Sequence, residues 1–178
     1  MGSGGQTSNQ TRLDFLYLSI HLNMTTPISL LSLSTREAVA DALYRGVLGL
    51  DTNDLAMWKS AWLEHDSSLD LNGKIMQGDE LIENLFKSIG PLETTHTISN
   101  IRVHVKEGED TAGMTASAVA QHYRPGEGVN PDTKGFLTGG LYFIDLLKDN
   151  SDELWKMRKW TLKLVWVEGD ASIVGGRR

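Results

Sequence analysis

The segment that decides the fold is IGPLETTHTISNIRVHVKEGE, residues 89–109, because the hydrophobic pattern changes within it. Upstream of Gly90 and Pro91, apolar residues recur at helical spacing, and downstream they alternate with polar residues as in a strand. Gly and Pro are typical of helix ends, whereas β-branched residues favour strands. The segment therefore predicts helices before it and a sheet after it, and it places His96 at the start of the first long strand.

Helical signals dominate the chain before this segment. Ser34 followed by Glu37 matches a capping box, and the apolar residues that follow keep a helical period as far as the turn signal DTND, residues 51–54. The predicted elements are a helix from residue 35 to about residue 50, a short helix within 55–64, a short strand and turn over 67–78, and an amphipathic helix over 79–90.

Strand signals dominate the chain after it. The long strands are predicted within residues 95–109, 111–126, 134–148 and 153–169, and the polar stretches KEGED and KDNSD are typical of hairpin turns. Gly113, Gly139 and Gly140 lie inside strands and suggest bulges or sharp bends. Helices followed by long antiparallel strands indicate an α+β fold, a cone-like barrel in which the helices pack against a strongly curved sheet.

Composition narrows the class of protein. The chain has 178 residues, enough for one domain, predicted over residues 31–178. We expect residues 1–30 to form a flexible leader or a tag-like extension, and the alternative is an arm that packs on a neighbour. A net charge of −6 argues against nucleic-acid binding, and the absence of Cys excludes disulfides and thiol chemistry. No apolar run approaches the ~18 residues of a membrane-spanning helix, so we expect a cytoplasmic protein without membrane partners.

Strand parity indicates which side chains could face a pocket. In the strand 111–123, small and apolar residues share one face with His122, and in the next strand Thr138 and Tyr142 share one face. Asp51 closes the first helix, seven residues after Tyr44, so both can face one side of that helix. A mostly apolar face with a few polar side chains is typical of a small-molecule site. The alternatives are a structural histidine and an Asp51 that belongs only to the DTND turn.

The order of these pieces resembles the SnoaL-like branch of the nuclear transport factor two-like superfamily, and within it the scytalone dehydratase-like proteins. The resemblance covers roughly residues 35–170. It rests on the stretches YRGVLGLDTNDLAMW, TTHTISN, AQHYRPG and GGLYFIDLLK…ELWKMRKW…VWVEGD. It implies a cone-like α+β fold with a deep pocket. It also implies acid–base chemistry by two histidines and an aspartate, at His96, His122 and Asp51.

The chain departs from this pattern where the family polarises its substrate. Leu50 and Leu71 stand where scytalone dehydratase has tyrosines, and Thr138 and Gly140 lie near its serine and asparagine positions. We therefore expect a more apolar and roomier pocket, lined by these four residues with Tyr44 and Tyr142, and a substrate other than scytalone.

These expectations lead to a cofactor-independent enzyme. We expect His122, paired with Asp51, to act as acid and His96 to act as base on a small polyketide- or terpenoid-like carbonyl substrate. Dehydration, cyclisation and isomerisation all fit this trio, and no metal is expected. The alternative is a non-catalytic binding or scaffold protein of the same fold. The last strand carries an apolar stripe that consists of Trp160, Leu162, Leu164 and Trp166. This stripe predicts a homo-oligomer, a dimer or trimer, that forms through the sheet.

Overall fold

The structure is a computed structural model that describes residues 27–175. Most of the predicted leader, residues 1–26, lies outside the described residues. The helices are α1 (Thr35–Asp51), α2 (Leu55–Ser60), α3 (Gly78–Ile89) and the 3₁₀ turn η1 (Ala171–Ile173). The strands are β1 (Ser68–Leu71), β2 (Lys74–Gln77), β3 (Glu93–Val105), β4 (Thr111–Tyr123), β5 (Phe136–Lys148) and β6 (Trp155–Gly169). No helix among these residues is long and apolar enough to cross a membrane.

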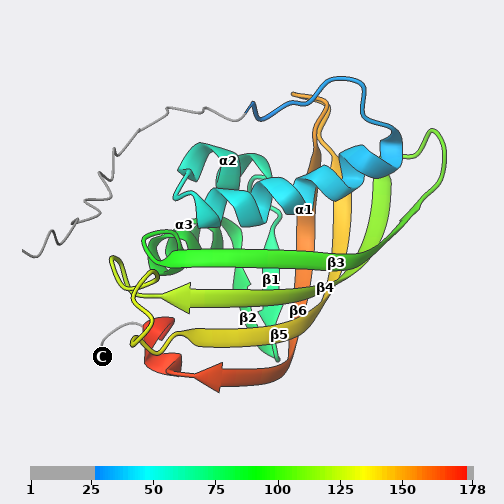
Figure 1. Cartoon of the computed structure of the whole chain (residues 1–178). Coiled ribbons are helices and arrows are strands. Elements are labelled where there is room, and N and C mark those ends of the chain that lie inside the picture. The colour runs from blue at the N-terminus through cyan, green and yellow to red at the C-terminus, as the bar shows by residue number, and fades with distance from the viewer. Residues whose placement is uncertain (1–26, 176–178) are drawn as a thin grey trace, which may run out of the picture.

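One six-stranded sheet runs in the order β2-β1-β6-β5-β4-β3, and it remains open rather than closing into a barrel. All pairings are antiparallel except that of β1 with β6, which is parallel. The long strands bend strongly, and α1, α2 and α3 lie on the concave side (Figure 1). The predicted α+β class with helices over a curved sheet is confirmed. The short strand predicted near residue 70 is a hairpin that turns at Asn72 and Gly73, both with positive φ.

The start and the end of α1 are both fixed locally. The predicted capping box is present, since Ser34 N donates to Glu37 Oε2 at 2.7 Å and Glu37 N donates to Ser34 Oγ at 3.4 Å. Near the other end, a Cβ on Gly49 would lie 2.5 Å from the backbone nitrogen of Trp58. Glycine at this position therefore lets α2 pack directly on α1. The last turn of α1 lies over the start of β3, where Asp51 contacts Thr94 and His96.

The inner face of the sheet follows the predicted parity in β4 and β5. Even-numbered residues of β4 from Met114 to His122 are buried, and those of β5 include Phe136, Tyr142 and Ile144. The register shifts between Gly139 and Gly140, as the glycine pair predicted. Gly113 shows no bulge, because its pairing with both neighbouring strands is continuous.

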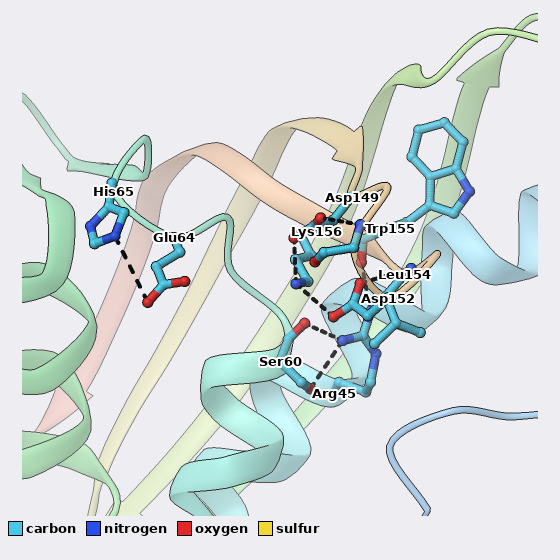
Figure 2. Close-up of polar contacts among 10 residues, drawn as sticks. Arg45, Ser60, Glu64, His65, Asp149, Asp152, Leu154, Trp155 and Lys156 are labelled. Atoms are coloured by element: carbon cyan, nitrogen blue, oxygen red, sulfur yellow. Dashed lines mark hydrogen bonds and ion pairs between the residues drawn. The ribbon is translucent and has the colours of Figure 1, made fainter.

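Two buried cations lie near the start of β6, and one of them, Arg45, joins the helices to the sheet (Figure 2). Arg45 on α1 donates to Asp41 at 2.8 Å, to Ser60 at the end of α2, and to the carbonyl oxygen of Trp155 at the start of β6 at 2.6 Å. Lys156 contacts the carboxylates of Asp149 and Asp152, each at 2.7 Å. Arg45 therefore holds α1, α2 and β6 at one point, and Lys156 holds the β5–β6 turn.

The predicted apolar stripe on β6 does not lie on one face. Trp160 is buried in the core, and Leu162 pairs with the inward-facing Tyr142. Gly139 pairs with Trp166 and Gly140 pairs with Leu164, so β6 has one extra residue between these two pairs. The extra residue reverses the side on which the following side chains of β6 lie. Of the four predicted residues, only Trp166 therefore lies on the outer face, over Gly139. The exposed apolar side chains of the outer face are instead Val119, Leu141, Phe143 and Trp166.

We predict that a second copy of the chain covers this outer face. The four side chains lie in neighbouring rows of the sheet, and exposed apolar patches of this kind mark interfaces. Lys163 and Glu168 lie beside them on β6, so the face offers both signs of charge to a copy of itself. Light scattering is expected to give a multiple of 19.7 kDa, and Phe143→Glu to shift the mass toward one chain. A wild-type mass near 19.7 kDa at micromolar concentration contradicts the prediction.

Candidate functional site

A carboxylate–imidazole pair lies where α1 ends over the start of β3. Asp51 Oδ1 lies 2.6 Å from His96 Nδ1, and Asp51 Oδ2 accepts a hydrogen bond from the backbone N–H of His96 at 2.9 Å. The hydroxyl of Thr94 donates to Asp51 Oδ1 at 2.7 Å. Both side chains are largely buried, with 7% of His96 and 16% of Asp51 exposed. Three hydrogen bonds therefore hold the carboxylate, and the carboxylate holds the imidazole with its Nε2 away from Asp51.

The second imidazole comes from the neighbouring strand. His96 pairs with Ala120 in the register of β3 and β4, and His122 lies two residues further along β4 on the same face. Such diagonal neighbours are within reach of each other in an antiparallel sheet. The ring centroids of His96 and His122 are 5.7 Å apart, with the planes at 86°. The structure therefore brings Asp51, His96 and His122 together on the concave side of the sheet.

The partners of the two histidines differ from the expected ones. We expected Asp51 to pair with His122, but its hydrogen bonds go to His96 and Thr94. His122 Nδ1 lies 3.1 Å from the carbonyl oxygen of Phe136. A carbonyl oxygen can only accept, so Nδ1 of His122 carries a proton and its Nε2 keeps a lone pair when the ring is neutral. The pairing prediction was wrong because the end of α1 crosses over β3 and not over β4.

Burial and hydrogen bonding determine the charges of this site. Burial acts to raise the pKa of Asp51, but the hydrogen bonds and charge of His96, with the hydroxyl of Thr94, outweigh it and lower the pKa. Burial lowers the pKa of His122. The pKa of Tyr142 is raised far above its usual range by burial and by the nearby charge of Asp51. At neutral pH the site therefore holds an ionised Asp51, a neutral His122 and a protonated Tyr142.

The lowered pKa of His122 gives a prediction. We expect the Cε1–H resonance of His122 to titrate with a midpoint below the ordinary value of 6.5. Asp51→Asn is expected to lower the midpoint further, because the negative charge of Asp51 acts to raise it. The unfolded chain binds this proton first as the pH falls below 6.5, so His122 should also make folding less stable there. NMR titration with a His122→Gln variant for assignment measures the midpoint, and a value above 6.5 contradicts the prediction.

The other predicted site residues divide into two groups. The first group lies on the inner face of β5 and consists of Thr138, Gly140 and Tyr142. In the neighbouring strand β4 they pair with Ala120, Ala118 and Ala116, respectively. Ala116, Ala118 and Ala120 are buried. The row of Tyr142 lies four residues from the row of His96, about 13 Å along the strands. Between these two rows the inner face carries Ala118 of β4 and Gly140 of β5, flanked by Ile98 of β3 and Leu164 of β6. We call this part of the inner face the floor of the candidate site, and the roomy pocket over it stays a prediction.

The remaining predicted residues lie away from this floor. Leu50 is buried in the hydrophobic core beneath α1. Leu71 ends β1, where it pairs with Leu162 of β6. Tyr44 faces β3 as Asp51 does, but two turns earlier on α1. There it lines a hollow of about 680 Å³ with Ile101 and Val103, together with other residues of α1 and β3. That hollow is not lined by the catalytic candidates, so a single cavity around them stays a prediction.

Sequence reasoning missed two contributors to the site. Thr94 lies in the quoted stretch ETTHTISN, two residues before His96, and the strand period places it on the same face. The backbone carbonyl of Phe136 carries no sequence signal, because any residue supplies one. Across residues 27–175 no three His, Asp or Glu side chains are grouped closely enough to hold a metal ion.

The family model of the SnoaL-like domain matches residues 31–161. The chain belongs to the SnoaL-like family. A curated relative, terrestric acid biosynthesis cluster protein E of Penicillium crustosum, is 46% identical over 151 residues, 84% of this chain and 96% of the relative. This relative and the family model establish the assignment that the sequence resemblance predicted.

Solved structures share the fold of this SnoaL-like protein at low sequence identity. A candidate scytalone dehydratase from Novosphingobium aromaticivorans superimposes with a TM-score of 0.62 at 18% identity, over 75% of this chain and 85% of that one. The hexachlorocyclohexane dehydrochlorinase LinA-type3 of Novosphingobium barchaimii gives 0.60 at 16% identity, over 80% and 94%. At these identities the similarity shows the cone-like α+β fold alone.

Proposed function

We propose that the protein is a cofactor-independent acid–base enzyme of secondary metabolism. Its substrate is a small polyketide- or terpenoid-like carbonyl compound, and its reaction is a dehydration or a cyclisation or isomerisation. The relative that is 46% identical is named for a biosynthetic cluster of a fungal acid, which supports a role in secondary metabolism. The observation that carries the proposal is the contact of Asp51 Oδ1 with His96 Nδ1 at 2.6 Å on the concave side of the sheet.

This contact supports His96 as the base. An ionised carboxylate accepts the Nδ1 proton of His96, which leaves the Nε2 lone pair free to take a proton from the substrate. When His96 takes that proton, the adjacent Asp51 stabilises the imidazolium. The buried setting strengthens this interaction relative to water. His96 therefore serves as general base, and the role that the sequence suggested for it is kept while its partner changes.

A dehydration can be completed with the same imidazole. His96 Nε2 removes a proton from the carbon next to the substrate carbonyl, and the electron pair moves into the carbonyl as an enolate. The enolate then expels the β-hydroxyl group, which takes the proton held by His96 and leaves as water. A carbon–carbon double bond forms and His96 returns to its neutral form. An isomerisation uses the first step and returns the proton to a different carbon.

The neighbouring polar groups position the substrate. Neutral His122 offers its Nε2 lone pair to a substrate hydroxyl rather than acting as a standing acid, since burial lowers its pKa. Tyr142 keeps its proton because its pKa is raised, but its row lies about 13 Å along the strands from that of His96, so its hydroxyl can contact only the end of a substrate that is remote from His96. Thr138 lies in the same row as His96 and Ala120 and offers a second hydroxyl on this face.

A gene-replacement experiment tests the function and separates the reactions. The gene of the relative would be deleted in Penicillium crustosum, and the strain would then receive this chain or its His96→Ala variant. The compound that accumulates in the deletion strain is then incubated with purified protein. A dehydratase converts it to a product lighter by one water molecule, and an isomerase to a product of equal mass. Binding without conversion by the wild-type protein contradicts the proposal and favours the non-catalytic alternative.

A further inference from the structure

The hydroxyl of Thr94 and the imidazole of His96 share one carboxylate oxygen of Asp51. Thr94 Oγ1 donates to Asp51 Oδ1 at 2.7 Å, and His96 Nδ1 lies 2.6 Å from the same oxygen. The other oxygen, Oδ2, accepts the backbone N–H of His96 at 2.9 Å. A carboxylate oxygen offers about two lone pairs to donors. The two side chains therefore occupy Oδ1 fully and draw on the charge of the same atom.

The fold fixes the Thr94 hydroxyl beside this oxygen. Thr94 lies two residues before His96 in β3, so the two side chains lie on the same, half-buried face of the strand. In the neighbouring strand, Thr94 pairs with His122, which is buried. A β-branched side chain has few χ1 rotamers, so the hydroxyl loses little freedom when it meets Asp51. The contact is therefore part of the regular sheet and does not depend on a loop.

Sharing the oxygen weakens the hold of Asp51 on the proton at His96 Nδ1. Burial acts to raise the pKa of Asp51, while the hydrogen bonds and charge of His96 and the hydroxyl of Thr94 act to lower it. A carboxylate that already accepts a hydrogen bond is a poorer acceptor for a further proton. Without the Thr94 hydroxyl, Oδ1 would hold the Nδ1 proton more tightly and would stabilise the imidazolium of His96 more strongly. Nε2 of His96 would then be occupied by a proton over a wider range of pH.

We propose that Thr94 is a positioning residue that limits how strongly Asp51 stabilises the imidazolium of His96, and so keeps Nε2 of His96 available as a base toward lower pH. The part that concerns turnover rests on the proposed function, whereas the shared hydrogen bonds belong to the free protein. Among the described residues, the titratable groups around His96 are Asp51 of α1, His122 of β4 and, further away, Tyr142 of β5. A change at Thr94 alters none of these side chains, so its effect can be assigned to the shared oxygen.

The free protein tests the shared oxygen without a substrate. Thr94→Val replaces the hydroxyl by a methyl group, and Thr94→Ser keeps the hydroxyl. The side-chain carboxyl carbon of Asp51 is followed by ¹³C NMR as the pH is changed, with Asp51→Asn for assignment. We expect Thr94→Val to move the titration midpoint of Asp51 upward by roughly 0.5–1 pH unit, because the carboxylate loses one hydrogen bond, and Thr94→Ser to leave it near the wild-type value. Equal midpoints in Thr94→Val and Thr94→Ser overturn the proposal.

Turnover across the pH range separates this tuning from a structural role. Thr94→Val is expected to move the acid limb of the kcat/KM profile to higher pH and to keep turnover near the wild-type level at about pH 9, with Thr94→Ser restoring the wild-type profile. Thr97→Val is the matched control, because Thr97 lies on the exposed face of the same strand, and it should change neither the profile nor the Asp51 titration. An equal loss of turnover at every pH indicates a structural role and overturns the proposal. If the carboxyl titration moves as expected but the wild-type protein turns nothing over, the proposed function fails and this inference stands.

Discussion

His96→Ala is expected to reduce turnover of the natural substrate by ~10²–10⁴-fold, because it removes a positioned general base. The Asp51→Asn variant is also expected to lose most activity, because it lacks the carboxylate that accepts the Nδ1 proton of His96 and so keeps Nε2 unprotonated. The double variant should lose little more than either single variant, because the two groups act as one unit. Activity would be measured for all variants between about pH 5 and pH 9.

A matched control separates catalysis from loss of a histidine. His104 lies on the same strand as His96 but on the exposed face, so His104→Ala should keep wild-type turnover. His122→Ala should weaken substrate binding more than the chemical step, because neutral His122 orients the substrate. Additive losses in Asp51→Asn and His96→Ala contradict the assignment of the pair.

Arg45→Met is expected to lower the free energy of unfolding by about 3–5 kcal/mol, the cost of breaking a buried ion pair from one side. Only 4% of the Arg45 side chain is exposed. Its loss leaves the Asp41 carboxylate buried without a cation and also leaves the carbonyl oxygen of Trp155 without this donor. Urea unfolding followed by circular dichroism measures the change.

The control for Arg45→Met is Arg158→Met. Arg158 forms an ion pair with Asp66 at 3.4 Å in which both side chains are more than half exposed. Pairs of this kind contribute less than about 1 kcal/mol, so the unfolding midpoint should barely move. If the two variants lose equal stability, the Arg45 cluster does not hold α1, α2 and β6 together.

Much of the fold could be predicted because its signals are local. The capping box at Ser34, the end of α3 before Pro91, and the inward face of β4 all follow from residue type and spacing within a few positions. The glycine pair at residues 139–140 also predicted a bulge correctly. Parity placed His122 on the inner face of β4, and the family resemblance added His96 as the second imidazole of the site.

The features that the sequence did not predict depend on long-range packing. The bulge opposite Gly139 adds a residue to β6, which turns Trp166 to the outer face and leaves Leu162 on the inner face. No local pattern says which strand carries the extra residue. Likewise, the choice of His96 over His122 as partner of Asp51 depends on where α1 crosses the sheet.

Deuterium incorporation at the carbon next to the substrate carbonyl tests the central claim most directly. Wild-type protein in D₂O is expected to place deuterium at that carbon in returned substrate or isomerised product, with the rate collapsing in His96→Ala and in Asp51→Asn but not in His104→Ala. Incorporation at the wild-type rate in His96→Ala would show that the Asp51–His96 pair does not move the proton.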